Sequence, residues 1–490
     1  MAFLERNANR GSISTQYDID NSLKFESDNS EYLTKTYSSA GNSKTWTLSV
    51  WVKRTELGMD TGTSHMIFGA GDTYLHFLSN DKLYANLRTA STNFFWGNDR
   101  LYRDTAAWYH IVMAVDTTQG TAADRVKVYV NGIQETPTET SYNNISQNAD
   151  TRVNSANEHE IGKYTFAEIE GMQYAEYFSG YMAEMHVIDG SAKLPTDFGR
   201  FDDSNIWVPK AYAGTYGTNG FYLNFDDSSS SGNDSSGNNN DFADSGISEI
   251  DHATDTPTNN FCIMNNNART NGNIKASHGG TYVSTSGGSG YCSMTGTMGM
   301  SKGKWYWEAK FHNDSGETNT VFLGIAAAND PWIPSRQGGY YLGNVATGGS
   351  TGWYFVNGAV YNGGGTWTDG AGNGPGYGDI LMVAYDADNT TLYFGKNGTW
   401  LNSSNPANNS NGIELSSYYW SGHPNLLDHV LPAITVYQGD YMRSMNFGAF
   451  NYWNDAISSA NADANGYGSF EYAPPTGFYS LCSKNLAEFG

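Results

Sequence analysis

Apolar and polar residues alternate along much of the chain, in short runs separated by turn-forming residues. Over Val126–Val130, three valines alternate with Lys127 and Tyr129, which is the two-residue period of a half-buried β-strand. Asn131-Gly132 follows, and both residue types tolerate the positive φ angles of a type I′ turn. The pattern therefore predicts a β-hairpin at this point.

The same arrangement recurs far downstream, where residues 392–399 read LYFGKNGT with Asn397-Gly398 at the turn. Each hairpin is preceded by another alternating run that ends in aspartate, WYHIVMAVD at 108–116 and GDILMVAYDAD at 378–388. Both regions thus read as strand, Asp turn, strand, Asn-Gly turn and strand. This repeated meander predicts two domains of related all-β design.

Alternating runs recur at β-sandwich spacing on both sides of a polar segment, which predicts the domain organisation. We expect an N-terminal arm or edge strand over 1–24, a first sandwich over 25–215, a connecting strand and linker over 216–254, a second sandwich over 255–450, and a C-terminal tail over 451–490 that packs back on the body. The linker is expected because its centre, rich in Asp, Ser, Asn and Gly, has almost nothing apolar to bury. The run GFYLNFD at its start is a strand that either sandwich could use.

Longer motifs carry resemblances to known families. Residues 25–190 resemble a laminin-G-like, concanavalin A-like lectin domain through WTLSVWVKR, AAWYHIVMAVD, VKVYVNGIQ and YFSGYMAEMHVIDGSAKLPTDF. Residues 255–450 resemble a SPRY domain through SKGKWYWEAKF, FLGIAAA, GDILMVAYDADNTTLYFGKNGTW, LPAITVY and MNFGAF. These resemblances imply an all-β chain of two antiparallel β-sandwiches.

Three further segments resemble parts of tailed-phage virion proteins that carry this pair of domains. They are NDSSGNNNDF at 233–242, DTPTNNFCIMN at 255–265 and PPTGFYSLCSKNL at 474–486. The resemblance implies a virion protein, which assembles in the host cytoplasm and leaves by lysis. The N-terminal sequence, which has no apolar stretch typical of a signal peptide, agrees with that expectation.

Composition and charge narrow the expected partners and cofactors. The net charge of −23, from 27 basic and 50 acidic residues, repels nucleic acid and anionic lipid, so neither nucleic acid nor membrane insertion is expected. Cys262, Cys292 and Cys482 are too few and too scattered for a disulfide framework or a thiolate zinc site. No cofactor is expected. A calcium ion at a lectin-like rim stays open, since its ligands would be scattered Asp and Asn side chains and backbone carbonyls that the sequence does not identify.

Concanavalin A-like sandwiches include glucanases, which place carboxylates at alternate positions of one strand. The run AEIEGMQ offers Glu168 and Glu170 on one face, but Gln173 stands where a third carboxylate would be expected. Glutamates are also frequent on solvated strand faces. We therefore assign no catalytic residue and do not expect an enzyme.

Exposed aromatic rings are the remaining candidate chemistry, because the C–H faces of sugars pack on them. The second sandwich has several aromatic residues in loop sequence rich in Gly, Asn and Ser. The candidates for ligand binding are Trp332, Trp367, Trp420, Tyr340, Tyr341 and Tyr377. The alternative is that these rings cap the cores or fill subunit interfaces.

The expected function is that of a phage virion structural protein, of the tail-fibre or receptor-binding type. Such a protein would contact other virion proteins, form a homo-oligomer, most simply a trimer, and attach to a host-surface glycan or protein. A capsid decoration protein, a glycan-degrading enzyme and a non-phage adhesion protein are the alternatives.

Overall fold

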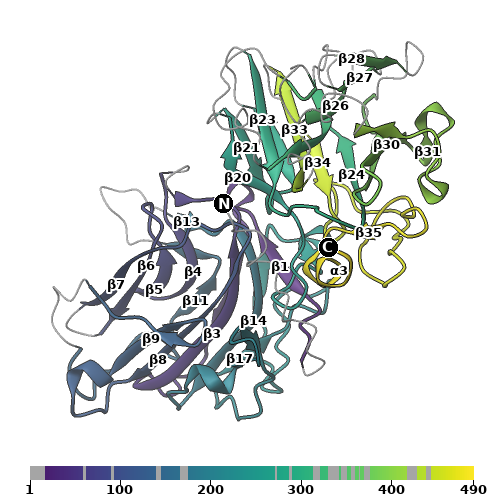
Figure 1. The fold of residues 1–490 in the computed structure, drawn as a ribbon. Coiled ribbons are helices and arrows are strands. Elements are labelled where there is room, and N and C mark those ends of the chain that lie inside the picture. The colour runs from purple at the N-terminus through teal and green to yellow at the C-terminus, as the bar shows by residue number, and fades with distance from the viewer. Residues whose placement is uncertain are drawn as a thin grey trace. The chain divides into compact units, whose positions relative to one another are not determined.

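The computed structural model describes residues 17–58, 62–89, 93–138, 145–165, 175–270, 273–285, 290–312, 321–328, 341–343, 350–354, 359–362, 365–368, 376–415, 428–437 and 443–490. These residues form two compact units, one ending at Thr258 and the other running from Asn259 to Gly490 (Figure 1). The expected start of the second sandwich, residue 255, lies within the first unit.

The first unit is a sandwich of two antiparallel sheets. One is eight-stranded and contains, in spatial order, β10 (Ile133–Gln134), β9 (Val126–Val130), β8 (Trp108–Asp116), β3 (Thr45–Arg54), β14 (Gly180–Asp189), β1 (Ser22–Phe25) and β19 (His252–Ala253), with β17 (Phe221–Leu223) also paired to β14. The other is seven-stranded and contains β18 (Ala243–Ser245), β2 (Tyr32–Thr36), β11 (Glu158–Ile161), β4 (His65–Ala70), β5 (Thr73–Phe77), β6 (Lys82–Arg88) and β7 (Asn93–Leu101). Two small hairpins, β12 (Lys163–Thr165) with β13 (Ala175–Tyr177) and β15 (Gly199–Phe201) with β16 (Trp207–Pro209), and the short 3-10 helices η1 (Ser27–Asn29), η2 (Ala122–Asp124), η3 (Pro195–Asp197) and η4 (Glu249–Asp251) complete it.

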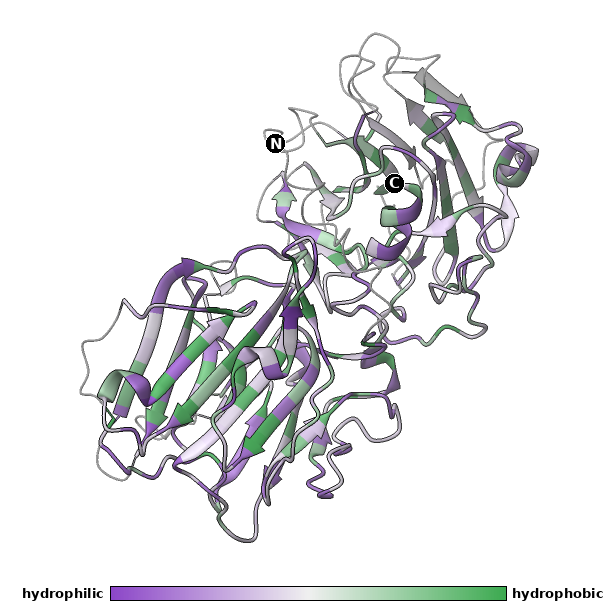
Figure 2. Ribbon diagram, turned by 60° about the horizontal axis from the view of Figure 1, so that its bottom comes forward, coloured by the Kyte–Doolittle hydropathy of each residue, from purple (hydrophilic) through white to green (hydrophobic). Residues whose placement is uncertain are grey.

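The core of the first unit lies between its two sheets. Trp46, Leu48 and Val50 enter it from β3, and Leu75 and Phe77 enter it from β5. Because side chains alternate between the faces of a strand, the intervening residues lie on the outer faces of the sheets. Figure 2 shows this alternation as successive hydrophobic and hydrophilic bands along the strands.

The connecting strand expected within 216–254 is present as β17, but the polar remainder of this segment is not a linker, because it folds onto the first sandwich. β17 pairs with β14, and β18 pairs with β2. Between these strands, the carboxylate of Asp234 accepts hydrogen bonds from the backbone N–H groups of Tyr222 at 2.9 Å and Asn240 at 2.8 Å. Such side-chain-to-backbone bonds order a polar segment without apolar burial.

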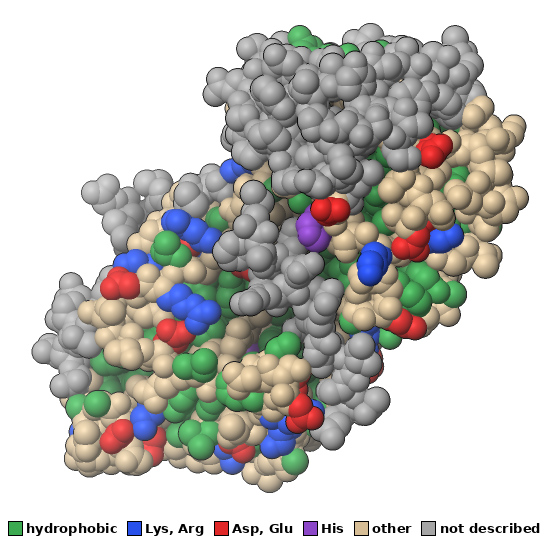
Figure 3. Space-filling model, viewed as in Figure 1, with side chains coloured by type: hydrophobic (Ala, Val, Ile, Leu, Met, Phe, Trp, Pro, Cys, Tyr) green, Lys and Arg blue, Asp and Glu red, His purple; other side chains and the backbone are tan. Residues whose placement is uncertain are grey.

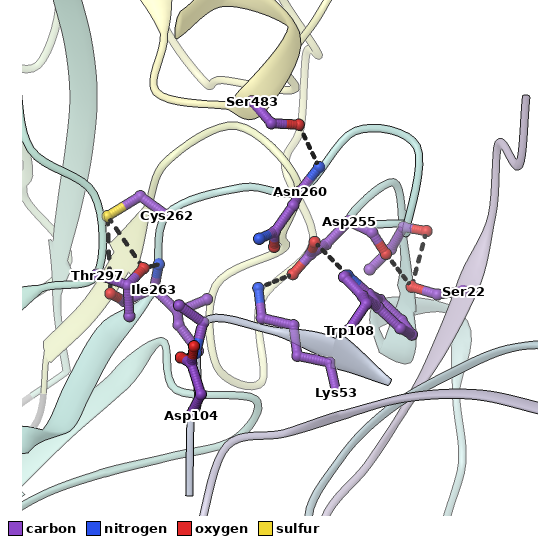
Figure 4. Close-up of polar contacts among 12 residues, drawn as sticks. Ser22, Lys53, Asp104, Trp108, Asp255, Asn260, Cys262, Ile263, Thr297 and Ser483 are labelled. Atoms are coloured by element: carbon purple, nitrogen blue, oxygen red, sulfur yellow. Dashed lines mark hydrogen bonds and ion pairs between the residues drawn. The ribbon is translucent and has the colours of Figure 1, made fainter. Parts of the chain in front are cut away.

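The chain after β19 is also anchored to the first unit, by Asp255. Its carboxylate oxygens lie 2.7 Å from Nζ of Lys53 and 3.3 Å from the indole nitrogen of Trp108, and its backbone carbonyl accepts from the hydroxyl of Ser22 at 2.6 Å (Figure 4). The Lys53 and Asp255 side chains are fully buried. This segment is therefore part of the fold.

The second unit also contains two large sheets. One is seven-stranded, with β20 (Met264–Arg269), β23 (Tyr291–Gly296), β33 (Val430–Tyr437), β25 (Val321–Ala327), β26 (Ser350–Tyr354), β27 (Ala359–Asn362) and β28 (Gly365–Thr368). The other is nine-stranded, with β21 (Ile274–Ser277), β22 (Tyr282–Thr285), β34 (Arg443–Asn446), β24 (Lys304–Phe311), β29 (Ile380–Asp386), β30 (Thr391–Lys396) and β31 (Thr399–Trp400), while β32 (Ile413–Glu414) pairs with β30 and β35 (Tyr479–Ser480) with β24. Short 3-10 helices η5 (Leu401–Ser403) and η6 (Pro406–Asn408) and the helix α3 (Ser483–Phe489) are the other elements described.

Trp305 and Trp307 from β24 meet Leu323 and Ile325 from β25 in the core between these sheets. On the outer side of β24, the buried carboxylate of Glu308 binds the tail. It accepts from the backbone N–H groups at 471 and 472, each at 2.9 Å. Residues 451–490 are thus held against the second sandwich.

Both predicted Asn-Gly hairpins are confirmed. Asn131 and Gly132 have φ angles of 50° and 79°, and Asn397 and Gly398 have 48° and 81°. β8, β9 and β10 are adjacent in one unit, and β29, β30 and β31 are adjacent in the other. The two units therefore use the same three-strand meander.

Candidate functional site

The outer face of the seven-stranded sheet in the first unit carries a row of aromatic rings, which we call the aromatic strip. It consists of Tyr74 and His76 from β5, Tyr84 from β6, Phe95 from β7 and Tyr164 from β12. Leu75 and Phe77 lie between the β5 members and face the core, so the alternation of β5 places its ring-bearing residues outside.

Strand register brings the members of the strip together. Tyr74 is the direct cross-strand partner of Asn86, and His76 is that of Tyr84. Asn86 in turn lies opposite Phe95 on β7. Directly opposite residues share one face of the sheet, so these five side chains form a continuous surface over three strands.

The rings of the strip are in contact with one another. The ring centroids of Tyr74 and His76 are 5.0 Å apart, those of His76 and Tyr84 are 5.6 Å apart, and those of Tyr84 and Phe95 are 5.8 Å apart. Their planes are tilted or perpendicular, which is the favoured geometry for aromatic pairs. Tyr74, Tyr84 and Phe95 are half-buried, so part of each ring faces outward.

Tyr164 extends the strip over β4, because Gly69 leaves room for its ring. A Cβ atom at Gly69 would lie 2.9 Å from Cδ2 of Tyr164, closer than such contacts occur. The ring centroids of Tyr164 and Tyr74 are 4.7 Å apart. The hydroxyl of Tyr164 donates to the carboxylate of Asp72 at 3.4 Å, which fixes the ring in place.

Polar atoms without partners lie beneath these rings. Neither ring nitrogen of His76 has a hydrogen-bond partner among the described residues, although His76 is only 4% exposed, and Oδ1 of Asn86 is also without one. Burial lowers the pKa of His76 to about 3, so the imidazole is neutral near pH 7. A neutral imidazole offers one donor and one acceptor, the combination that a hydroxyl group can satisfy.

Glu176 adds a carboxyl group on the same side of the β12–β13 hairpin, since it is the direct partner of Tyr164. Burial raises the pKa of Glu176, and its Oε2 has no hydrogen-bond partner among the described residues. Glu168 and Glu170, weighed above as a catalytic pair, lie in the connection between β12 and β13, outside the described residues.

The six ligand-binding candidates from the sequence are only partly described. Trp332, Tyr340 and Trp420 lie outside the described residues, and for Trp367 only the backbone in β28, opposite Val360, is described. Tyr377 is 70% exposed.

Tyr341 packs on the outer face of β25. Its ring stacks on Phe322 with the centroids 4.2 Å apart and the planes 11° apart, and it also contacts Tyr291 and Tyr361. The structure therefore brings Tyr341 into an aromatic cluster on the sheet.

Sequence reasoning missed the aromatic strip, although the signal was present. The runs YLHFLS and LYANLRT alternate as strands, and their non-core positions hold Tyr, His and Asn where a solvated face usually carries charged residues or Thr. The register between the strands, which assembles these positions, is visible only in the structure.

The described residues contain no group of three or more His, Cys, Asp and Glu side chains that could hold a metal ion. None of their helices is long and apolar enough to cross a membrane. On the face drawn in Figure 3, Lys and Arg side chains of the first unit are interspersed with Asp and Glu and form no basic patch.

Comparisons with known proteins bear on both units. Residues 7–193 match the family model described as the concanavalin A-like lectin/glucanases superfamily. No curated protein sequence matches the chain. Similar solved structures include the SPRY domain of human HERC1, at 14% identity and a TM-score of 0.28 over 37% of this chain and 96% of that chain.

A heptameric SAP-like pentraxin from Limulus polyphemus is 18% identical, with a TM-score of 0.27 over 36% of this chain and 79% of that chain. The TRIM65 PSpry domain is 13% identical, with a TM-score of 0.26 over 38% of this chain and 91% of that chain. The predicted all-β fold is confirmed by the sheets described above. The family match identifies a concanavalin A-like, laminin-G-like domain in the N-terminal part of the chain, and such a domain fits a glycan-binding role.

Proposed function

We propose that this protein binds glycan through the aromatic strip of its first sandwich and serves as an attachment component of a tailed-phage virion. The observation that carries the binding proposal is the strip itself, where the half-buried rings of Tyr74, Tyr84 and Phe95 surround polar atoms of His76 and Asn86 that have no partner among the residues the structure describes. Aromatic rings contact the C–H faces of sugars, and the polar atoms would exchange hydrogen bonds with sugar hydroxyls.

The buried nitrogens of His76 favour binding over a purely structural role. A buried polar atom without a partner costs about 1–3 kcal/mol, which a ligand hydroxyl would recover. Binding at this depth requires the flanking rings of Tyr74 and Tyr84 to move apart. We infer binding without hydrolysis, and no catalytic residue is assigned.

The virion assignment is supported by the segments at 255–265 and 474–486, which resemble tailed-phage proteins. Parts of both lie side by side in the second unit. The hydroxyl of Ser483 accepts from the backbone N–H of Asn260 at 2.9 Å (Figure 4), and the backbone N–H of Cys262 donates to the carbonyl of Leu481 at 3.0 Å. Residues 260–262 and 481–483 are thus held together by backbone hydrogen bonds within the second unit. A homo-oligomer, with several copies on one particle, would raise the avidity of weak glycan sites by roughly 10²–10⁴.

The binding test uses the full chain on an array of bacterial surface polysaccharides, followed by titration with any polysaccharide retained. His76→Phe keeps an aromatic ring but removes both nitrogens. We expect it to weaken binding about tenfold while leaving the melting temperature unchanged or higher, because unpaired buried polar atoms are lost. His429→Phe, the same substitution at an exposed histidine of the second unit, is the matched control and should bind normally.

Unchanged affinity in His76→Phe, or no polysaccharide bound at all, contradicts the strip as a glycan site. Shortening of the bound polysaccharide would replace the binding proposal with an enzyme. The virion proposal is tested separately, by imaging phage particles labelled with antibody against this chain. Label at the tail supports the attachment role, whereas label over the head identifies a capsid decoration protein.

A further inference from the structure

A strained glutamate interrupts β14, an internal strand of the eight-stranded sheet in the first unit. Glu184 has a φ angle of 49°, in the left-handed region that a β-strand residue with a side chain rarely adopts. It lies in a bulge of β14, where the pairing with β3 shifts register between Ala183 and His186. Backbone strain of this kind persists where it positions a functional side chain, so the surroundings of the carboxylate are informative.

Two tyrosine hydroxyls converge on that carboxylate. The hydroxyl of Tyr17 donates to Oε2 of Glu184 at 2.6 Å, and that of Tyr222 donates to Oε1 at 2.5 Å. The two hydroxyl oxygens are themselves 3.4 Å apart. Four oxygen atoms are thus gathered from three separate parts of the chain.

A histidine nitrogen completes the group. His186 is the cross-strand partner of Tyr222, and their rings stack with centroids 4.3 Å apart and planes 7° apart. Nε2 of His186 faces Oε2 of Glu184 from 3.6 Å, which is too long for a hydrogen bond. Its other nitrogen, Nδ1, lies 3.0 Å from the hydroxyl of Tyr216, which fixes the orientation of the ring.

Two of these four separations match those of ligands that share one metal ion. Two donors at about 2.1 Å from a metal lie roughly 3.0–3.6 Å apart when they subtend angles of 90–120°. The pair of tyrosine oxygens and the pair formed by His186 and Glu184 both fall in or near that interval. The two hydrogen bonds from Tyr17 and Tyr222 to Glu184, at 2.6 Å and 2.5 Å, would lengthen by about 0.5 Å as the ion replaces the two phenol protons.

The local electrostatics favour a cation. Glu184 is only 6% exposed, and its carboxylate lies against the two tyrosine hydroxyls and His186. Further negative charge comes from Asp20, which acts on Tyr17, and from Asp234, which acts on Tyr216.

We propose that Tyr17, Tyr222, Glu184 and His186 form a binding site for a ferric ion. Two phenolates and one carboxylate carry three negative charges, which a trivalent ion neutralises, whereas a divalent ion would leave a net negative charge in a largely buried site. Phenolate and carboxylate oxygens are hard donors, and imidazole is a common ligand of iron. Tyrosine supplies two of the four donors at this site, and Glu184 and His186 supply the other two.

Binding releases one proton from each phenol to solvent and transfers no electron. The bound ion would link the segment before β1, through Tyr17, to β14 and β17. This role is independent of glycan binding, since the cluster lies on the eight-stranded sheet and the aromatic strip on the seven-stranded sheet.

The test adds ferric nitrilotriacetate to the purified full chain and records the visible absorption spectrum. We expect a charge-transfer band from phenolate to ferric iron that saturates at one equivalent per chain. Tyr17→Phe and Tyr222→Phe should each reduce the band at least twofold, and the double variant should abolish it. Gallium(III), which has no such band, should instead produce the ultraviolet difference spectrum of tyrosinate and raise the melting temperature.

Tyr212→Phe is the matched control, because Tyr212 contacts the His186 ring but its hydroxyl donates to the carbonyl of Thr215. It should keep the full band. Glu184→Gln keeps the shape of the side chain and one accepting oxygen, while its amide NH2 can donate to the second tyrosine oxygen; because the charge is lost, it should fold and lose at least tenfold in ferric affinity. Absence of the band in the parent chain, or its persistence in the folded double tyrosine variant, overturns the proposal.

Discussion

The indole nitrogen of Trp207 donates a hydrogen bond to Nδ1 of His110 across 3.0 Å. Because Nδ1 is the acceptor, Nε2 carries the hydrogen and donates to the hydroxyl of Ser49 at 2.9 Å. This pair ties β16 to the outer face of β8, and the two rings stack with planes 18° apart. His110 is therefore neutral, and both of its ring nitrogens make hydrogen bonds.

The first prediction concerns acid stability. Burial lowers the pKa of His110 to about 3, against an ordinary value near 6.5. Between these values the unfolded chain binds a proton that the folded chain does not. The free energy of unfolding should therefore fall as the pH drops below about 6.5, by up to about 1.4 kcal/mol per pH unit for this residue, until about pH 3.

Urea titrations at several pH values between 7 and 4 measure the slope of the free energy of unfolding against pH. His110→Gln is expected to be less stable at pH 7 but to show a slope smaller by about 1.4 kcal/mol per pH unit. The exposed His429 provides the control substitution to Gln, which should leave the slope as in the parent. An undiminished slope in His110→Gln contradicts the buried neutral histidine.

A second prediction compares the two hairpin glycines. Gly132→Ala and Gly398→Ala both force alanine to a positive φ and should each cost more than about 1 kcal/mol. The cost should be larger at Gly132, because an added Cβ would collide with the ring of Trp207, whereas at Gly398 it would lie 3.0 Å from the ring of Tyr472. Gly120→Ala is the control, since its Cβ would meet nothing within 4 Å. Thermal unfolding ranks the three variants, and equal stability of all three would refute the turn assignment.

A third prediction concerns the buried ion pair of Lys53 and Asp255. Asp255→Ala removes the carboxylate that faces the buried Lys53 ammonium at 2.7 Å and should destabilise the first unit by about 3–5 kcal/mol. The double variant Lys53→Met with Asp255→Leu removes both charges and should recover most of that loss. Chemical denaturation of the parent, the single variant and the double variant measures these differences in the free energy of unfolding. A single variant that costs less than about 1 kcal/mol would mean that water or another group already compensates the lysine.

A fourth prediction concerns the polar segment between β17 and β18. Limited proteolysis of the parent chain should not cut first within 226–241, because the Asp234 carboxylate holds its backbone. Asp234→Ala should make this segment the earliest site of cleavage. Asp226→Ala, at an exposed neighbouring aspartate, should leave the digestion pattern unchanged. Early cleavage there in the parent would restore the interpretation of the segment as a linker.

The sequence predicted the parts of the fold that depend on local chemistry. Asn131-Gly132 and Asn397-Gly398 determine their own turns, so the hairpins and the all-β class follow from short windows. The segment around Asp234 was misread because low apolar content was taken as absence of structure, whereas hydrogen bonds from backbone N–H groups to the carboxylate order it.

Neither the aromatic strip nor the proposed ferric site could be predicted from the sequence, because both depend on pairing between residues far apart in the chain. Tyr17 and Glu184 meet although 167 residues separate them. The aromatic strip requires the register that puts His76 opposite Tyr84, which no single window contains. Of the aromatic candidates chosen from loop composition, Tyr341 packs in a cluster on a sheet and Tyr377 is exposed. The composition of the surrounding loop does not distinguish a ring that packs on a sheet from a ring that is exposed to solvent.

The late partners of β1 and β24 have a consequence for the order in which the chain matures on the ribosome. β1 is flanked by β14 and β19, so the earliest strand of the first sandwich has no complete neighbourhood until residue 253 has been synthesised. β24 likewise awaits β35 at residues 479–480. A nascent chain that stops before residue 470 leaves the outer side of β24 uncovered, because Tyr306 packs against Phe470 and Phe478 there and Glu308 binds the backbone at 471 and 472. Exposed apolar surface of this kind makes an incomplete chain prone to aggregation until the segment from 470 to 480 has been synthesised.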